Sequence, residues 1–320
     1  MARRNEDKVI RNNNKKAHSK IKTQNKKATG RVRTEPGKSG SASSPRTGST
    51  RNAGASTRNS ERSEGSSFKE PNRTLKYGLG GEHVEGFHAV EVLIEHGRRK
   101  VTRLYVDREI ADSPEMTSLI YKAELKNTRV TRLSREQFMG RARTESPQGV
   151  IAYCTEKKPM ELDDMLLNPK AFLVVLDSLT DPNNIGAIIR SAEVAGATGV
   201  ILPKHRSGHL SPSAVKNAAG AVEFMNFGLC SGVPSFLMKA QKAGVTTLGM
   251  AGESKESLYD IKESAGPVIV IIGSEGKGLS QLVRKRCDHL LKIDQYGNTE
   301  SLNASAAAAV TLMHLAHLRN

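Results

Sequence analysis

Residues 267–305 read PVIVIIGSEGKGLSQLVRKRCDHLLKIDQYGNTESLNAS. The pattern predicts an apolar strand, a glycine-rich turn, a helix, a second strand, a polar loop and the start of the last helix. Both strands therefore deliver a polar loop to the same edge of a sheet. Ligands bind at that edge in open α/β sheets, because loops and helix N-termini meet there with unpaired backbone N–H groups. We interpret this stretch as the cofactor pocket of an enzyme.

Strands and helices alternate throughout residues 171–320. Residues 172–179, FLVVLDSL, are almost continuously apolar, which is typical of a strand buried on both faces of a parallel sheet. Further strands are expected at 199–202 and 246–250, and helices are expected at 185–196, 212–219, 233–243 and 303–318. This alternation predicts an α/β fold built on a doubly wound parallel sheet.

A smaller α/β unit is expected over residues 76–156, with a linker at 157–170. The stretch VEGFHAVEVLIEHG (84–97) has one broad apolar helix face and ends on a natural C-cap glycine. A strand at 103–107 and a helix from 114 to about 127 follow, and then a strand, a short helix and a strand.

Residues 1–75 contain almost no apolar clusters, so we expect a disordered tail. Residues 1–73 hold 19 Lys and Arg against 6 Asp and Glu, so +13 of the chain's net charge of +16 belongs to this tail. We favour a mobile arm that adds salt-sensitive affinity for a phosphate backbone. A solubilising or targeting tail is the alternative.

The remaining composition argues against several classes of protein. No apolar run approaches the length of a bilayer span and no secretory signal is evident, so we expect a cytoplasmic protein without a membrane partner. Cys154, Cys230 and Cys287 are far apart, with no CxxC pair, which argues against a disulfide framework or a zinc site. His314 and His317 have no third ligand beside them, so we expect no metal.

Polar clusters fall at the expected loops. The turn GSEGKG (273–278) matches neither the dinucleotide fingerprint nor the P-loop, and glycines in a tight turn need no further function. In DPNNIGAIIR (181–190), Asn184 occupies the expected N-cap and Gly186 allows close backbone approach. Arg190 carries a guanidinium that suits a phosphate or a developing oxyanion, although a surface salt bridge is its usual role.

A third cluster, SLNAS (301–305), places Ser301 and Asn303 at the start of the last helix, where they could serve only as N-caps. The three clusters together resemble the motifs of the SpoU family of the SPOUT superfamily, which are S-adenosyl-L-methionine-dependent RNA ribose 2′-O-methyltransferases. The first motif, N-x-G-x-x-x-R, appears as NIGAIIR, the second as IIGSEGKGLS and the third as SLNAS. The likeness covers residues 77–320 and is strongest to members that methylate a guanosine ribose in 23S ribosomal RNA.

The resemblance implies properties that the residue pattern alone does not give. Members of the family form a deep trefoil knot that holds S-adenosyl-L-methionine, chiefly through backbone groups. By position, Gly273, Ile293 and Leu302 should border the cofactor. Members also form homodimers through the methyltransferase domain, and the two subunits together build the active site. The smaller unit resembles a ribosomal-protein-like RNA-binding domain, so ribosomal RNA is the expected partner.

The resemblance also implies roles for individual side chains. Arg190 matches the catalytic arginine of the family. An arginine does not lose its proton in a protein, so we expect a phosphate clamp and alkoxide stabiliser. Asn184 and Glu275 are assigned to the shape of the site and to ribose contact, and Ser301 and Asn303 to the cofactor and substrate end.

One departure from the family concerns the loop before the third motif. Relatives commonly have a Pro-Met pair where this chain has Asp294 and Gln295, which would add a carboxylate beside the cofactor. Three alternatives stay open: a transfer RNA ribose methyltransferase, a catalytically silent RNA-binding or ribosome-assembly factor, and a nucleotide-dependent dehydrogenase. The dehydrogenase would need the missing G-x-G-x-x-G fingerprint.

Overall fold

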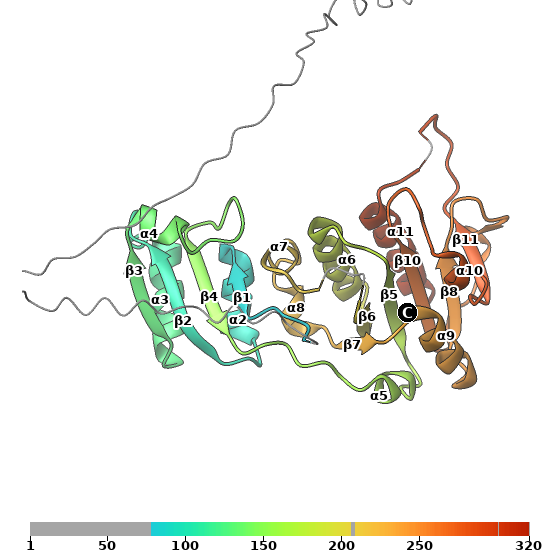
Figure 1. The fold of residues 1–320 in the computed structure, drawn as a ribbon, viewed down its shortest axis with the longest axis horizontal. Coiled ribbons are helices and arrows are strands. Elements are labelled where there is room, and N and C mark those ends of the chain that lie inside the picture. The colour runs from blue at the N-terminus through green and yellow to red at the C-terminus, as the bar shows by residue number, and fades with distance from the viewer. Residues whose placement is uncertain (1–77, 206–208, 300, 320) are drawn as a thin grey trace, which may run out of the picture. The chain divides into compact units, whose positions relative to one another are not determined.

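The computed structural model describes residues 78–205, 209–299 and 301–319, and these form two β-sheets with flanking helices (Figure 1). The tail predicted at 1–75 lies outside the described residues. The boundaries predicted at 76–156, 157–170 and 171–320 stay predictions.

The larger sheet has seven strands in the order β7-β6-β5-β10-β8-β11-β9, and every neighbouring pair is parallel. This arrangement confirms the predicted α/β fold with a parallel sheet. The chain runs from β5 out to β7 and then returns to fill the other side of β5, so the strand order reverses between β5 and β10. Loops that follow strands at such a reversal form the usual ligand crevice of an α/β protein. The strands are β5 (Phe172–Asp177), β6 (Gly199–Pro203), β7 (Phe227–Cys230), β8 (Thr246–Met250), β9 (Glu256–Ser257), β10 (Val268–Gly273) and β11 (His289–Lys292).

Helices cover both faces of this sheet (Figure 1). All six residues of β5 are buried, as predicted from its apolar run. Alternate residues serve opposite faces: Val174 packs with α6 (Pro182–Val194) and α11 (Ala304–Arg319), whereas Val175 packs with α9 (Val233–Lys242). Two short helices, α5 (Leu162–Leu166) and α10 (Gln281–Arg284), add to the α9 side.

Some predicted helix ends differ from the structure. Helix α6 begins at Pro182 rather than at 185, because Asp181 and not Asn184 is its N-cap and accepts hydrogen bonds from the next backbone N–H groups. The helix predicted at 212–219 divides into α7 (Pro212–Asn217) and α8 (Ala221–Phe224), because Ala219 and Gly220 have positive φ and interrupt it. A 3-10 turn, η1 (Leu258–Asp260), precedes β10.

The smaller sheet has the order β1-β4-β2-β3, with β1 (His83–Glu85), β4 (Val150–Cys154), β2 (Val101–Asp107) and β3 (Arg129–Leu133). The helices α2 (Phe87–His96) and α3 (Pro114–Leu125) pack on one face, and the short α4 (Arg135–Met139) lies on the other. The helix predicted from residue 84 was wrong at its start, since Val84 and Glu85 belong to β1, which pairs with β4. Gly86, with φ of 92°, makes the break between strand and helix.

A buried carboxylate ties β1 to the loop before β4. Glu85 is fully buried and accepts hydrogen bonds from His83 Nε2 at 2.6 Å, from the backbone N–H groups of Arg143 and Thr144 at 2.5 and 3.0 Å, and from the Thr144 hydroxyl. Burial alone would raise the pKa of Glu85. The hydrogen bonds from His83, Thr144 and Arg143 outweigh it, so the pKa lies below its ordinary value of 4.5.

Replacing Glu85 tests this anchor. Glu85→Ala leaves buried donors without an acceptor, so the free energy of unfolding in urea at neutral pH should fall by about 3 kcal/mol. Because the folded pKa is lowered, the stabilisation is complete above the ordinary pKa and is lost as the pH falls through the folded pKa. The difference between wild type and variant should therefore shrink as the pH falls below the ordinary pKa of 4.5. A difference that does not change with pH would contradict a charged acceptor.

Candidate cofactor and substrate site

The side chain of Glu275 connects all three predicted motifs. Its Oε1 accepts a hydrogen bond from Asn184 Nδ2 at 2.8 Å and another from Asn303 Nδ2. Asn184 lies in the first turn of α6 after β5, Glu275 lies in the turn after β10, and Asn303 directly precedes α11. Three segments that are distant in sequence therefore meet at the carboxyl ends of two neighbouring strands.

The two asparagines are held by further contacts of their own. Asn184 is 4% exposed, and its Nδ2 also donates to Asp181 Oδ2 at 2.8 Å. The Oδ1 of Asn303 accepts from the Ser305 backbone N–H at 2.8 Å and from the Ser305 hydroxyl at 2.6 Å. Asn303 is therefore both the cap of α11 and a partner of Glu275, so the two interpretations of SLNAS are compatible.

The turn between Gly273 and Gly278 is closed by backbone contacts. The N–H of Gly278 donates to the Ser274 carbonyl at 2.9 Å, and Ser274 N–H donates back at 3.1 Å. A Cβ on Gly273 would lie 2.2 Å from the Gly278 carbonyl carbon, so only glycine permits this close return of the chain. Asp177, at the end of β5, accepts from Ser280 N–H at 2.7 Å and fixes the far side of the turn.

A cavity of about 480 Å³ opens at this edge of the sheet. Gly273, Ile293 and Leu302, the three residues expected to border a cofactor, all line it, as do Glu275 and Ser301. The volume suits a small organic ligand. Sequence reasoning missed one wall, which consists of the last residue of β8 and the three residues that follow it. They could have been found by applying the carboxyl-edge rule to that strand too. These residues are Met250, Ala251, Gly252 and Glu253.

Asp294 and Gln295, which depart from the motif of the family, point in different directions. Gln295 lines the cavity, but Asp294 does not. The Asp294 carboxylate instead accepts from the Ser257 hydroxyl at 2.6 Å and lies 3.5 Å from Lys292 Nζ. The added charge is thus compensated beside the cavity, and the contact fixes the loop onto β9.

Arg190 lies apart from the Glu275 cluster. It sits on α6 six residues beyond Asn184, which turns it about 240° around the helix axis from that side chain. It is exposed, and within the described ranges it makes no hydrogen bond or ion pair and does not line the cavity. The structure of one chain therefore does not bring Arg190 to the other predicted residues.

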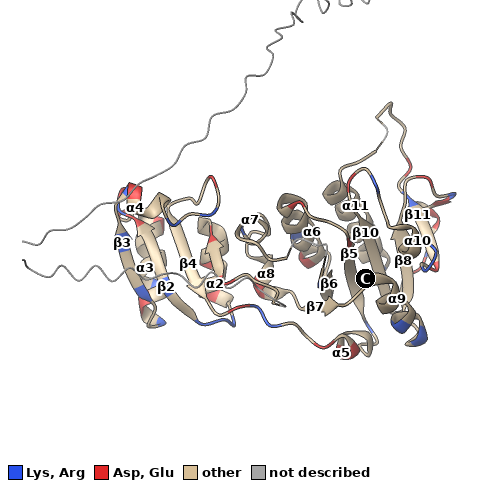
Figure 2. Cartoon of the chain, viewed as in Figure 1, with Lys and Arg blue, Asp and Glu red and all other residues tan. Residues whose placement is uncertain are grey.

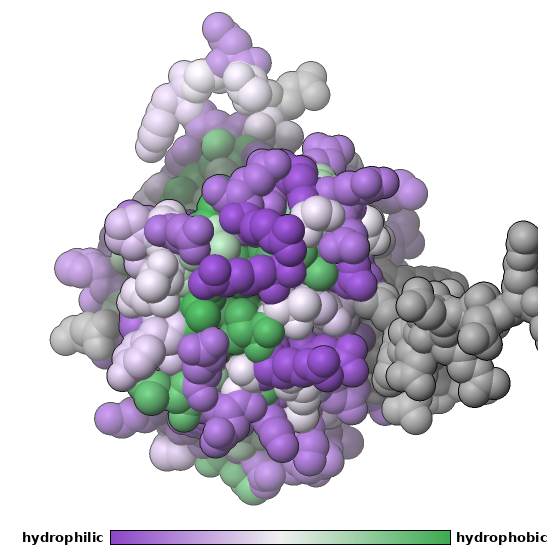
Figure 3. Space-filling model, turned by 90° about the vertical axis from the view of Figure 1, so that its left-hand side faces the viewer, coloured by the Kyte–Doolittle hydropathy of each residue, from purple (hydrophilic) through white to green (hydrophobic). Residues whose placement is uncertain are grey.

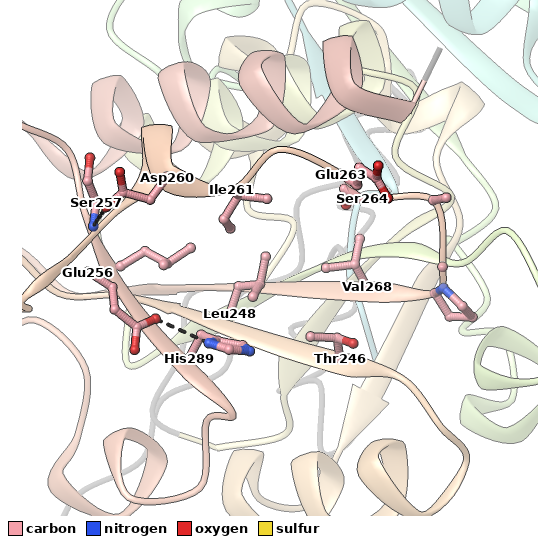
Figure 4. Close-up of a pocket in the computed structure, with 14 residues that line it drawn as sticks. Thr246, Leu248, Glu256, Ser257, Asp260, Ile261, Glu263, Ser264, Val268 and His289 are labelled. Atoms are coloured by element: carbon pink, nitrogen blue, oxygen red, sulfur yellow. Dashed lines mark hydrogen bonds and ion pairs between the residues drawn. The ribbon is translucent and has the colours of Figure 1, made fainter.

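A second cavity, of about 560 Å³, lies at the opposite end of the same strands (Figure 4). The chain segment from Glu256 to Pro267 covers it, and Thr246, Val268 and His289 line it from the starts of β8, β10 and β11. An ion pair of 3.1 Å joins Glu256 to His289 at its edge. No motif loop reaches this end, so we place the functional site at the smaller cavity.

Within residues 78–205, 209–299 and 301–319, no group of three His, Cys, Asp or Glu side chains could hold a metal ion. No helix in the same ranges combines the length and apolarity needed to cross a bilayer.

The Glu275 bridge can be tested by a double-mutant cycle. Glu275→Ala deprives one N–H of buried Asn184 of its acceptor, so the free energy of unfolding should fall by about 1 kcal/mol. The same change should cost less in an Asn184→Ala background, because the contact is already lost. Lys277→Ala, an exposed change in the same turn, is the matched control. Equal costs in both backgrounds would contradict the bridge.

Comparison with known families matches both parts of the described chain. Residues 171–313 match the model of the SpoU rRNA Methylase family, and residues 83–160 match the model described as RNA 2′-O ribose methyltransferase substrate binding.

Individual relatives extend this match over most of the chain. The chain is 35% identical over 240 residues to the 23S rRNA (guanosine-2′-O-)-methyltransferase RlmB of Ralstonia nicotianae, covering 73% of this chain and 95% of the relative. A protein of the same description from Pseudomonas syringae pv. tomato is 35% identical over 245 residues, with 75% and 96% covered. The crystal structure of the SpoU methyltransferase AviRb from Streptomyces viridochromogenes in complex with AdoMet superposes with a TM-score of 0.64 at 26% identity, covering 74% of this chain and 89% of that one. This protein therefore belongs to the SpoU rRNA methylase family.

Proposed function

We propose that this protein transfers a methyl group from S-adenosyl-L-methionine to the ribose 2′-oxygen of a guanosine in 23S ribosomal RNA. As a SpoU family member it is an RNA ribose-2′-O-methyltransferase. The proposal rests on one observation above all. The cavity bordered by Gly273, Ile293 and Leu302 adjoins the Glu275 cluster, in a chain that is 35% identical over 95% of an RlmB relative. This substrate would place the enzyme in the cytoplasm.

The cavity suits the proposed cofactor. Gly252, Gly276 and Gly278 line it, and no atom lies within 4 Å of where a Cβ would project from any of them. A nucleoside can therefore approach the backbone closely, with N–H and carbonyl groups available for hydrogen bonds. When bound, S-adenosyl-L-methionine supplies a methyl group on a sulfonium sulfur, already activated for displacement.

The protein then has to align the ribose oxygen with the methyl group and to stabilise the charge that develops on that oxygen. Glu275 holds Asn184 and Asn303 in fixed positions beside the cavity, and we assign to this cluster the orientation of the ribose. Ser301, in the cavity wall, is assigned to the cofactor end. Arg190 is assigned to an RNA phosphate and to the charge that develops on the ribose oxygen, because a guanidinium keeps its proton and binds oxyanions well.

A homodimer would explain the position of Arg190. Helix α11 is apolar around most of its circumference, and its exposed side carries Val310 and Met313, which are 37% and 49% exposed. A helix of this kind is usually covered on all sides. Val194 on the adjoining α6 is 65% exposed. We propose that a second copy covers this surface and that Arg190 of one subunit completes the cavity of the other. We also propose that the methyltransferase domain forms the trefoil knot expected from the family.

Methyl transfer to purified RNA tests the reaction. Wild type should transfer label from S-adenosyl-L-methionine to 23S ribosomal RNA and not to transfer RNA. Arg190→Ala should lower kcat/KM by about a hundredfold or more, with unchanged cofactor affinity. Arg190→Lys, which keeps the charge but loses the planar fork, should recover only part of the rate. Label on transfer RNA alone would favour the transfer RNA enzyme. RNA binding without any transfer would favour the silent assembly factor.

Mixed dimers test whether two subunits share a site. Leu302→Trp should fill the cavity and abolish cofactor binding, which calorimetry can check, and Arg190→Ala should remove the clamp. Each variant alone should be inactive. Dimers that contain one copy of each should regain activity, because the intact cavity of one subunit meets the intact arginine of the other. Mixed dimers that stay inactive would contradict a shared site.

A further inference from the structure

The smaller sheet has one face that its long helices leave uncovered. Along β2, Leu104 and Val106 belong to the core that α2 and α3 cover. Side chains alternate along a strand, so Arg103 and Tyr105 lie on the opposite face. There Tyr105 and Tyr153 pack at the edge of a small cluster centred on Phe138 of α4. We call this side the outer face.

Strand pairing arranges the outer face in rows. Tyr153 of β4 pairs with His83 of β1 and with Arg103 of β2, and Arg103 pairs in turn with Arg129 of β3. One row thus crosses all four strands with a histidine, a tyrosine and two arginines. Tyr105 stands in the next row, paired with Ile151 and Thr131.

Aromatic rings and guanidinium groups alternate on this face. The Tyr105 and Tyr153 rings meet edge to face, with centroids 5.8 Å apart at 90°. Tyr153 meets the His83 ring in the same way at 4.8 Å. The Arg141 guanidinium lies 5.2 Å from the centroid of the Tyr105 ring, within cation–π range. The rings are therefore fixed by their neighbours rather than free to rotate.

Arg103, Arg129 and Arg141 lie around these rings, and the ribbon of β3 carries the colour of Lys and Arg in Figure 2. The same face also holds the carboxylates of Glu85 and Asp107, which pair with His83 and Arg135. Arg103 and Arg129 lie directly opposite each other on neighbouring strands, an arrangement that like charges make unfavourable. Arg129 is exposed and has no ion pair within the described ranges. Arg103 donates to the Tyr105 hydroxyl at 3.4 Å, so the exposed Arg129 is the guanidinium of this pair that a phosphate would contact first.

The side of the molecule that bears β3 is mostly hydrophilic, with small apolar patches between the polar groups (Figure 3). The short α4 covers the outer face near Leu133 and Ile151, and the loop after α4 covers it near His83 and Glu85. Tyr105 and Tyr153 stay partly exposed beyond it. Flat aromatic faces between guanidinium groups, with little continuous apolar surface, suit nucleic acid rather than a protein partner.

We infer that the outer face binds a single-stranded segment of the RNA substrate, with a base stacked on Tyr105 and backbone phosphates on Arg103, Arg129 and Arg141. Unpaired bases stack on aromatic rings and on guanidinium planes, whereas a duplex hides its base faces. The inference rests on the proposed function for the identity of the RNA. It adds the surface through which the smaller sheet holds that RNA.

Substitutions on the outer face test the inference by RNA affinity, measured by fluorescence anisotropy with 23S ribosomal RNA in the full-length protein. Tyr105→Leu should weaken binding about tenfold, and Tyr105→Phe, which keeps the ring, should stay within about twofold of wild type. Arg129→Gln should weaken binding and lower the salt slope by about one. Lys122→Gln removes a half-buried charge that pairs with Glu95 on α3, behind the sheet, and should not change RNA affinity.

The melting temperature of the free protein distinguishes a role of Arg129 in RNA binding from a role in folding. Because Arg129 faces Arg103, Arg129→Gln should leave the melting temperature of the free protein unchanged or raised while RNA affinity falls. Single-stranded oligouridylate should compete for binding, and duplex RNA of equal length should compete far less. The inference is overturned if Tyr105→Leu and Arg129→Gln bind RNA no worse than Lys122→Gln does, or if duplex competes equally. RNA bound at this face without methyl transfer would overturn only the proposed function.

Discussion

The site depends on one carboxylate oxygen of Glu275 that accepts two side-chain amides. The amides belong to Asn184 and Asn303, which are 91 and 28 residues away in sequence. Parallel strands make this meeting possible, because β5 and β10 are neighbours and both end at the same edge. A carboxylate can accept several donors at once, so a single side chain can hold the start of α6 against the start of α11. The cavity wall includes Glu275 itself, so its shape depends on the same contact.

Local sequence predicted the larger sheet well, and its apolar runs explain why. The burial of β5 and the bounds of β8 follow from short apolar stretches between breaks. The strands β1 and β9 have three and two residues, too few for any periodicity to be visible. Their pairing with β4 and β11 is a property of the assembled sheet. These two edge strands could therefore not be predicted from the sequence.

For the site, the resemblance to the family placed Gly273, Ile293 and Leu302 together, and the three residues line one cavity. That they bind the cofactor stays a prediction. It was harder to predict which polar side chains form hydrogen bonds with each other. Asp181, not Asn184, caps α6, and the Asn184 amide donates to both Asp181 and Glu275. Both residues are good caps, so only the three-dimensional arrangement distinguishes their roles.

The chain thus divides the work between two sheets. The larger one gathers backbone groups and polar side chains around a cavity, and the smaller one offers rings and guanidinium groups on the face away from α2 and α3. The central claim is that the methyl group reaches a ribose oxygen. Alkaline hydrolysis of RNA labelled by the wild-type enzyme tests it most directly, because a 2′-O-methyl group blocks cleavage of the next phosphodiester bond. We predict that the label is recovered in an alkali-stable dinucleotide that begins with guanosine. Label recovered in mononucleotides would mean that a base is methylated and would contradict the account.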